Sequence, residues 1–460
     1  MRLSTAFLAL SFVAVPASAH AQLRLADALR RADSAAVPNR IAAGQRAERA
    51  GQAVGALRGL LPSVRVETGI VRTTDPIGAF GTLLRQRRIG QSDFDPARLN
   101  DPSPVTNYTS GLVADVPLLN ADAWLGRRAA TRAADAGVSS AAFTSSTVRA
   151  DVVRAFFGVQ LADERVHTLE AAMKAGAAHV RQAESMQRNG MVTPADALMA
   201  SVKSGEIEAD LATARGDVAT ARRELGTLIG ASDGAVESPS GTLPQASALR
   251  AFVAAERDTA PIPRLDVAAA ALSASAARAD AERARASLLP RVNGIARWDW
   301  NDRSRSFGGD KSWTVGVMAT WTPFSGGAEL ADQRTTSARA AIAGAAADGA
   351  AAQASTEAAR AVMDVDVALK RLVIAERGAV QSADAHRIVT RRYEGGLASV
   401  AELLDAAAGE SRSTLLLAKT RYDVIAALAT RRLATGRDPA TLAMLDIETT
   451  PNNNSQDTNR

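Results

Sequence analysis

Glu402 and Asp405 are the residues whose types and spacing point most directly to chemistry. They are three positions apart, so on a helix both carboxylates project to one side. In a three-fold assembly each position becomes a ring of three carboxylates, and such rings concentrate cations and repel one another. The pair therefore predicts a cation-selective pore constriction. The alternative is two exposed carboxylates near a helix N-terminus.

No other group of residues suggests catalysis. The four histidines do not cluster, no glycine-rich phosphate loop follows a strand, and no nucleophile-elbow spacing occurs. We therefore predict that His167, His179 and His386 are solvated helix residues. Cysteine is absent from the whole chain, which excludes disulfides, a thiolate nucleophile, Cys-ligated zinc and a lipid-accepting Cys. The sequence predicts no enzymatic activity, no cofactor and no metal.

Charge and the first residues limit the class of protein. The chain has 54 basic and 49 acidic residues, and no basic tract interleaves with aromatic residues, so we expect no nucleic-acid partner. Arg2, the apolar stretch Leu3 to Val15 and Ala19-His20-Ala21 form the pattern of a signal peptide. The mature chain is then expected to begin at Gln22. Because no later stretch of about 18 uncharged apolar residues follows, a membrane-bound mature protein would have to be a β-barrel.

The chain contains an internal repeat. Leu60-Leu61-Pro62-Ser63-Val64 recurs as Leu288-Leu289-Pro290-Arg291-Val292. Three later pairs share one offset of 206 residues: Val116-Pro117-Leu118 with Thr322-Pro323-Phe324, Gly190-Met191-Val192-Thr193 with Gly396-Leu397-Ala398-Ser399, and Leu228-Ile229-Gly230 with Ala434-Thr435-Gly436. A constant offset means that no insertion separates the copies there, as expected if rigid helices fix the lengths.

Each copy carries two segments with the alternation of a β-strand. Trp313, Val315 and Val317 alternate with Thr314 and Gly316, and similar patterns begin at Val64, Tyr108 and Val292. Each segment is about ten residues long, which a tilted membrane-spanning strand needs. A half-buried strand in a soluble sandwich is the alternative. Four of the five tryptophans lie between positions 298 and 321, where an aromatic girdle at a lipid interface would place them.

Long helices precede and follow these hairpins. Helical stretches at 40–60 and 265–288 lead into the strands, and proline-free stretches at 122–188 and 328–393 follow them. About 66 residues give roughly 100 Å of helix. Each long helix is predicted to reverse at a glycine, Gly190 or Gly395-Gly396, and to restart at Thr193 or Ser399.

These segments predict the organisation of the whole chain. The expected parts are a signal peptide at 1–21, a first repeat at 22–230 with a hairpin at about 62–117, an equatorial linker at 231–263, a second repeat at 264–436 with a hairpin at about 290–322, and an irregular C-terminal tail at 437–460. Four strands cannot close a barrel, and their free edges would leave unpaired backbone groups in lipid. We therefore expect a mainly α protein with a small β part, in which three protomers form one 12-stranded barrel continuous with an α-helical coiled-coil barrel.

The whole mature chain resembles the TolC family of outer-membrane efflux proteins. The resemblance rests on the repeated Leu-Leu-Pro before each hairpin, on Pro117-Leu118-Leu119-Asn120 and Pro323-Phe324-Ser325-Gly326-Gly327 before the long helices, and on the Gly-x-x-Thr/Ser turns. It implies a homotrimer in the outer membrane of a Gram-negative bacterium with its helices in the periplasm. The implied function is a passive exit duct for efflux or type I secretion, working with a periplasmic adaptor and an inner-membrane transporter. A structural coiled-coil protein or adhesin without a pore is the alternative.

The resemblance also assigns roles to residues. Glu402 and Asp405 match the acidic pair at the periplasmic constriction, although the family usually has Asp at the first position. Asp196 and Tyr393 match positions that hold the helix pairs closed. The expected basic partner is missing, since Ala398 stands there, which leaves Arg391 or Arg392 as substitutes. The turn residues match the tips that dock with the adaptor: Gly190, Met191, Val192, Gly396, Leu397 and Ala398. Glycine turns without any partner are the alternative.

Overall fold

The computed structural model describes residues 22–231, 236–256 and 262–447, so the expected signal peptide at 1–21 lies outside the described residues. The chain divides into two compact units. Unit 1 contains residues up to Ile41, Thr144–Pro263 and the residues from Ser355 on, and unit 2 contains Ala42–Phe143 and Arg264–Ala354. Each repeat therefore contributes to both units.

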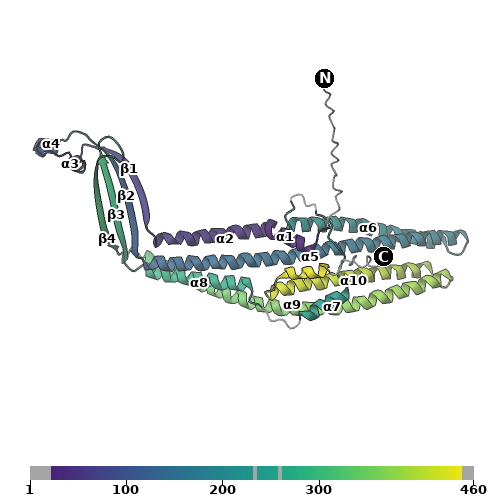
Figure 1. Cartoon of the computed structure of the whole chain (residues 1–460). Coiled ribbons are helices and arrows are strands. Elements are labelled where there is room, and N and C mark those ends of the chain that lie inside the picture. Colours follow the sequence, from purple (N-terminus) through teal and green to yellow (C-terminus); the bar gives the residue numbers. More distant parts are fainter. Residues whose placement is uncertain (1–21, 232–235, 257–261, 448–460) are drawn as a thin grey trace, which may run out of the picture. The chain divides into compact units, whose positions relative to one another are not determined.

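Unit 2 contains a four-stranded antiparallel sheet in the order β1-β2-β3-β4 (Figure 1). The strands are β1 (Ser63–Thr73), β2 (Val105–Leu119), β3 (Arg291–Asp302) and β4 (Asp310–Thr320). Each strand falls where the alternation predicted it. The central pair, β2 with β3, joins the two repeats, and β1 and β4 are the edges of the sheet.

One face of the sheet is apolar. The register aligns Val66, Leu112, Trp298 and Trp313 in one row across all four strands. A second row aligns Val64, Ala114, Ala296 and Val315. Most of these side chains are exposed, with Trp313 at 69% and Val315 at 68%. An exposed apolar surface of this kind marks a site of contact with lipid or another chain.

The opposite face of the sheet carries a network of charges. Arg65 of β1 lies 3.2 Å from Asp115, and Arg297 of β3 lies 2.7 Å from Asp299. Arg297 also reaches Glu67 of β1 at 3.5 Å, across the intervening β2. Gly111 occupies the position between Glu67 and Asp299, where a Cβ atom would meet the Asp299 carboxylate at 3.0 Å. The glycine leaves room for the charges of β1 and β3 to meet.

The loop between β1 and β2 has more structure than the sequence predicted. It contains α3 (Pro76–Arg85), η2 (Gln91–Phe94) and α4 (Pro96–Asn100), with α3 and α4 beside one end of the sheet (Figure 1). A chain of buried amides ties this loop to the strands. Gln86 donates to Asn107 (2.9 Å), and Asn107 donates to Asn301 (2.8 Å).

Unit 2 also contains the helical segments that lead into and out of the sheet. These belong to α2 (Val37–Gly55), η1 (Ala56–Gly59), α5 (Ala121–Arg188), α8 (Leu265–Ala286) and α9 (Ala328–Glu394). Their buried positions in this unit are almost all alanines, such as Ala53, Ala136, Ala279 and Ala284. Alanine permits close approach between helices, which explains the alanine-rich composition.

Unit 1 contains two long helix hairpins. In the first, α5 is followed by α6 (Pro194–Leu228), and in the second, α9 is followed by α10 (Val400–Ala434) (Figure 1). Leu169 of α5 packs with Leu211 and Ala214 of α6. These helices start and stop within one or two residues of the predicted positions. Among the described helices, none has the combination of length and apolar composition that crossing a membrane requires.

The main core of unit 1 joins both hairpins to several short elements. Phe156 and Phe157 of α5 are fully buried and stack edge to face, 5.5 Å between ring centroids. They share a cluster with residues of α1 (Leu25–Ala35), α10 and α7 (Ala246–Ala255). The segment 231–263 was expected to be only a linker, but α7 places Leu249 and Val253 in this core.

The expectation of an irregular tail from 437 is wrong for the first part of that segment. Residues Pro439–Ala443 form η3 and Met444–Ile447 form α11, and Leu442 and Leu445 are buried in the core of unit 1. Asp446 accepts hydrogen bonds from the Leu25 amide (2.9 Å) and the Ser240 hydroxyl (3.3 Å). These contacts stabilise the segment, and they come from residues far away in the sequence, so no local pattern predicts them. Residues 448–460 lie outside the described residues.

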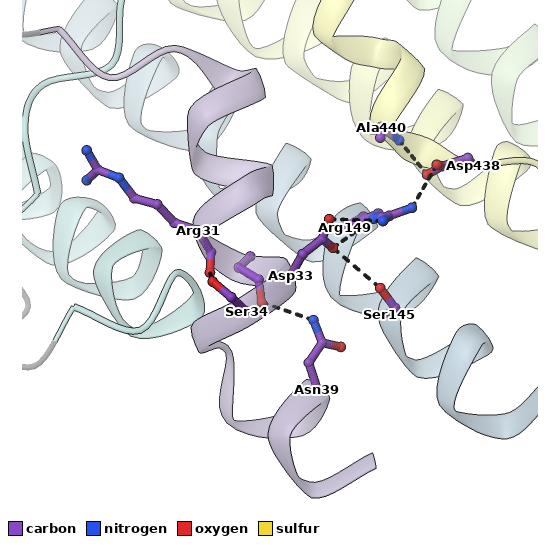
Figure 2. Close-up of polar contacts among 9 residues, drawn as sticks. Arg31, Asp33, Ser34, Asn39, Ser145, Arg149, Asp438 and Ala440 are labelled. Carbon is purple, nitrogen blue, oxygen red and sulfur yellow. Dashed lines mark hydrogen bonds and ion pairs between the residues drawn. The ribbon is translucent and has the colours of Figure 1, made fainter. Parts of the chain in front are cut away.

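Arg149 of α5 connects α1 with the same C-terminal segment (Figure 2). Its Nε and Nη2 each lie 2.9 Å from an oxygen of Asp33, and its Nη1 lies 2.8 Å from Asp438. Asp438 in turn accepts from the Ala440 amide (2.9 Å) at the start of η3. One guanidinium thus holds carboxylates from two distant segments.

Candidate functional site

The predicted site residues lie at the two helix reversals of unit 1. Gly190 and Gly396 both have positive φ, 71° and 73°, which glycine adopts without the cost that a Cβ atom brings. The amide of the next residue bonds back to the final turn, Met191 to Met186 (2.9 Å) and Leu397 to Arg392 (2.7 Å). This Schellman motif ends both α5 and α9.

The return helices start with matching capping boxes. Thr193 accepts from the Asp196 amide (3.3 Å) and donates its own amide to the Asp196 carboxylate (2.9 Å). Ser399 accepts from the Glu402 amide (3.2 Å) and donates its amide to the Glu402 carboxylate (3.0 Å). The two boxes lie 206 residues apart, so the repeat extends to individual hydrogen bonds.

A cavity of about 370 Å³ lies between the two reversals. It brings together most of the predicted latch and tip residues, but Leu397, Glu402 and Asp405 do not line it. The lining residues are Met186, Gly190, Met191, Val192, Thr193, Asp196, Tyr393, Gly396, Ala398, Ser399 and Val400. The two turns therefore form one site.

Asp196 and Tyr393 both line this cavity, but no hydrogen bond joins them. The Tyr393 side chain is only 2% exposed, and its hydroxyl has no hydrogen-bond partner among the described residues. Burial, and then the charge of Asp196, raise the pKa of Tyr393. Hydrogen bonds from the Thr193 hydroxyl and amide lower the pKa of Asp196. The Asp196 carboxylate thus accepts the hydrogen bonds of the capping box, and its negative charge also raises the pKa of Tyr393.

The arginines considered as partners of Asp196 do not pair with it. Arg392 donates to the carbonyl oxygen of Leu397 (3.0 Å), where it stabilises the second turn. Arg391 is exposed. Within the described residues, the ion pair expected at the latch is therefore not formed.

Glu402 and Asp405 are both exposed near the start of α10. The Glu402 carboxylate takes part in the capping box described above. Asp405 acts on Lys203 of α6, whose pKa is raised first by its hydrogen bond to Glu206 and more weakly by Asp405. The two carboxylates thus remain accessible to solvent or to a neighbouring chain.

Beneath the cavity, the reversals share a small apolar core. It contains Ala183 and Ala197 of the first hairpin together with Tyr393, Val400 and Leu403 of the second. This tip core packs one hairpin against the other. Among the described residues, no group of three or more His, Cys, Asp or Glu is arranged to hold a metal ion.

Sequence reasoning missed one polar contact near the tip. The prediction of solvated histidines holds for His167, whose side chain is 80% exposed, but it is wrong for His179 and His386. Their rings lie 6.3 Å apart between centroids, and the Nε2 atom of each is buried. Both stand ten or eleven residues before the turn glycine of their repeat, which is the one sequence signal that could have paired them.

Comparison with solved structures identifies the fold. VceC of Vibrio cholerae shares 19% identity with this chain at a TM-score of 0.74, covering 90% of this chain and 96% of that one. CmeC of Campylobacter jejuni shares 15% identity at a TM-score of 0.75, covering 92% and 88%. The open state of MtrE of Neisseria gonorrhoeae shares 20% identity at a TM-score of 0.69, covering 90% and 89%. All three are outer-membrane proteins, and the likeness shows a common fold.

Comparison with family patterns extends this result. No curated protein sequence matches the chain significantly. The pattern of the outer membrane efflux protein family matches residues 38–231 and 258–437, which is more than half of the chain and one match for each repeat. The chain therefore belongs to the outer membrane efflux protein family.

Proposed function

We propose that this outer-membrane efflux channel works as a trimer that forms one passive exit duct. The two-faced sheet with free edges carries the proposal. In lipid, the unpaired backbone groups of β1 and β4 would each cost several kcal/mol. Pairing β4 of one copy with β1 of the next removes these edges, and three copies supply twelve strands.

The aromatic residues support a position of the sheet across a bilayer. Trp298 and Trp313 are cross-strand partners near the β3–β4 loop, whereas Trp321 and Trp124 lie at the opposite end of the sheet. From Trp313 to Trp321 is eight residues, or about 27 Å at 3.4 Å per residue. That span matches the apolar band of about 25 Å between the aromatic girdles of such barrels. The apolar face then contacts lipid and the charged face lines the lumen.

The helix tips are the proposed docking site for a periplasmic adaptor, which links the duct to an inner-membrane transporter. Met191 and Leu397 stand at the two turns and are 63% and 73% exposed. Exposed apolar side chains beside the tip cavity are a suitable surface for binding a helix turn of the adaptor. We assign the docking role to Gly190, Met191, Val192, Gly396, Leu397 and Ala398.

The closed state of the duct is proposed to depend on two groups of residues. Rings of Glu402 and Asp405 from three copies would repel one another and attract cations at the constriction. Asp196 lies on the first hairpin and Tyr393 on the second. Both line the tip cavity and serve as the latch. Because no hydrogen bond joins Asp196 to Tyr393, the latch is weak and adaptor contacts are sufficient to open it.

Conductance in planar lipid bilayers tests the proposal. The purified trimer is expected to conduct with a preference for cations. The double variant Glu402→Ala, Asp405→Ala should lose most of that preference and conduct less, because the ring of negative charge that concentrates cations at the constriction disappears. Glu208→Ala, an exposed carboxylate of α6, is the control and should change neither quantity.

Two results would contradict the proposal. Absence of any conductance by a folded, detergent-purified protein would favour the structural coiled-coil alternative. Unchanged cation preference in the double variant would remove Glu402 and Asp405 from the constriction while leaving the duct itself intact.

A further inference from the structure

Two histidines meet where the helix hairpins pack above the tip. His179 of α5 and His386 of α9 lie edge to face, with ring centroids 6.3 Å apart and ring planes at 72°. The Nε2 atom of each ring is buried and has no hydrogen-bond partner among the described residues. Buried polar atoms are normally paired, so an unpaired nitrogen in each of two neighbouring rings requires an explanation.

A carboxylate accompanies only one of the two rings. Glu410 of α10 contacts the Nδ1 atom of His386, and the side chains are 37% and 19% exposed. A carboxylate can only accept, so this ring nitrogen carries the proton. Glu410 therefore places a negative charge beside His386. His179 has no ion pair among the described residues.

The surrounding charges leave His179 without a counter-charge. On α6, Lys203 pairs with Glu206 (2.7 Å), and on α9, Asp384 pairs with Arg387 (2.8 Å). Asp405 and Arg412 of α10 act electrostatically on Lys203, and Arg181 and Glu184 of α5 are exposed. Within the described residues, Glu410 is the carboxylate in contact with the pair. The pair therefore has one negative partner, and positive charges on both rings would be only partly balanced.

Protonation of His179 is consequently unfavourable in this arrangement. Burial, and then the positive charge of His386, lower the pKa of His179. A base whose pKa is lowered in the closed arrangement stabilises that arrangement while it is neutral. The contribution is complete above the ordinary histidine pKa of about 6.5 and declines as the pH falls below that value.

The histidine pair lies close to the tip core, so protonation of His179 would affect the packing there. Val180 and Val389, one and three positions further along the same helices, pack against the tip core. The first ring belongs to the α5–α6 hairpin, and its partner belongs to the α9–α10 hairpin. Two like charges at this point repel across the contact between the hairpins.

We propose that His179, His386 and Glu410 form a pH-sensitive contact that keeps the two hairpins together at neutral pH and releases them on mild acidification. The inference rests on the proposed function, in which separation of the hairpins opens the duct. The periplasmic side of the channel would then open more readily when its surroundings become acidic.

Conductance at about pH 7.5 and about pH 5.5 provides the first test. The wild-type trimer should show a several-fold higher open probability at the lower pH, because protonation of His179 is disfavoured in the closed arrangement. His179→Gln keeps a polar side chain of similar size but cannot titrate, and it should lose most of this rise. The control His167→Gln, at an exposed position of the same helix, should keep it. An equal rise in His179→Gln and wild type would overturn the proposal.

A distance measurement separates this inference from the proposed function. Ala178 and Ala385 are exposed and directly precede the two histidines. Because the chain has no cysteine, Ala178→Cys with Ala385→Cys places spin labels at only these sites. The label distance should increase at the lower pH and remain constant when His179→Gln is added. If the protein never conducts but the label distance depends on pH, the proposed exit duct is refuted and the pH-sensitive contact stands. If the label distance does not change with pH, the pH-sensitive contact is refuted.

Discussion

At the scale of single residues, carboxylates in this chain have more than one task. Asp196 and Glu402 were predicted as latch and constriction residues, yet in the structure each also closes a capping box at the start of a helix. The same atoms thus define the turn geometry and the charge of the tip. A substitution there changes both, and the paired variants of Glu402 and Asp405 are best compared with variants of exposed carboxylates that cap nothing.

Arg149 allows a clear prediction about stability. Its side chain is 28% exposed and holds Asp33 and Asp438 together. Arg149→Met keeps much of the apolar stem but leaves both carboxylates without an ion pair, so the free energy of unfolding should fall by about 1–3 kcal/mol. Urea unfolding in detergent measures the change.

Arg30→Met is the matched control for Arg149→Met. Arg30 also pairs with an aspartate of α1, Asp27, but its side chain is 80% exposed. Exposed pairs contribute about 0–1 kcal/mol, so this variant should change stability little. Equal losses in the two variants would show that Arg149 does not join the segments energetically.

At the scale of helices and strands, the glycines that end the long helices differ in their surroundings. Gly190 has a positive φ, but a Cβ atom added there would have no other atom within 4 Å, whereas a Cβ at Gly230 would lie 2.5 Å from the Cβ of Ala35. Gly190→Ala should therefore cost about 1–2 kcal/mol for backbone conformation alone. Gly230→Ala should cost clearly more, because α1 must also move away.

Gly205→Ala is the control for these two variants. Gly205 lies within α6, has no positive φ and has open space around its Cβ position. In a helix interior alanine is preferred over glycine by about 0.5–1 kcal/mol, so this variant should be stabilised. From most to least stable, we expect the order Gly205→Ala, wild type, Gly190→Ala, Gly230→Ala. The free energy of unfolding of each protein measures this order. A Gly230→Ala variant more stable than Gly190→Ala would contradict the structure.

The elements that the sequence predicted well are those whose signals are local. Alternation placed the four strands, and the glycine turns placed the ends of α5 and α9 within a residue or two. The short helices α3, α7 and α11 were missed, because too few residues show a period and their burial depends on distant partners. The roles of the tip residues rest on resemblance and stay predictions. The meeting of His179 with His386 depends on the packing of two hairpins, which no local pattern encodes.

At the scale of the whole molecule, pairing between the sheet edges of neighbouring copies can be tested directly. Val66 of β1 and Val315 of β4 are exposed on the same face of the sheet. Within one chain they are separated by three strand spacings across the sheet and by two residues along the strand, or about 16 Å. In a chain carrying Val66→Cys and Val315→Cys, a crosslinker shorter than about 10 Å should therefore yield covalent dimers and trimers rather than an internal link.

The single-cysteine variants provide the control for this experiment. Each carries one thiol in a chain that otherwise has none, so neither can form a chain-to-chain ladder beyond a dimer. Exclusively monomeric product from the double variant, in a detergent that preserves the fold, would contradict the shared barrel.

The hydrogen bond between the Leu25 amide and Asp446 joins positions 421 residues apart in sequence. Because synthesis and export proceed from the N-terminus, the first helix emerges long before the segment that receives it. Its apolar side must wait, unprotected, until nearly all of the polypeptide has crossed the inner membrane. Completion of this core therefore cannot precede export of nearly the whole chain, and an escorting chaperone would be needed most at the start of the chain.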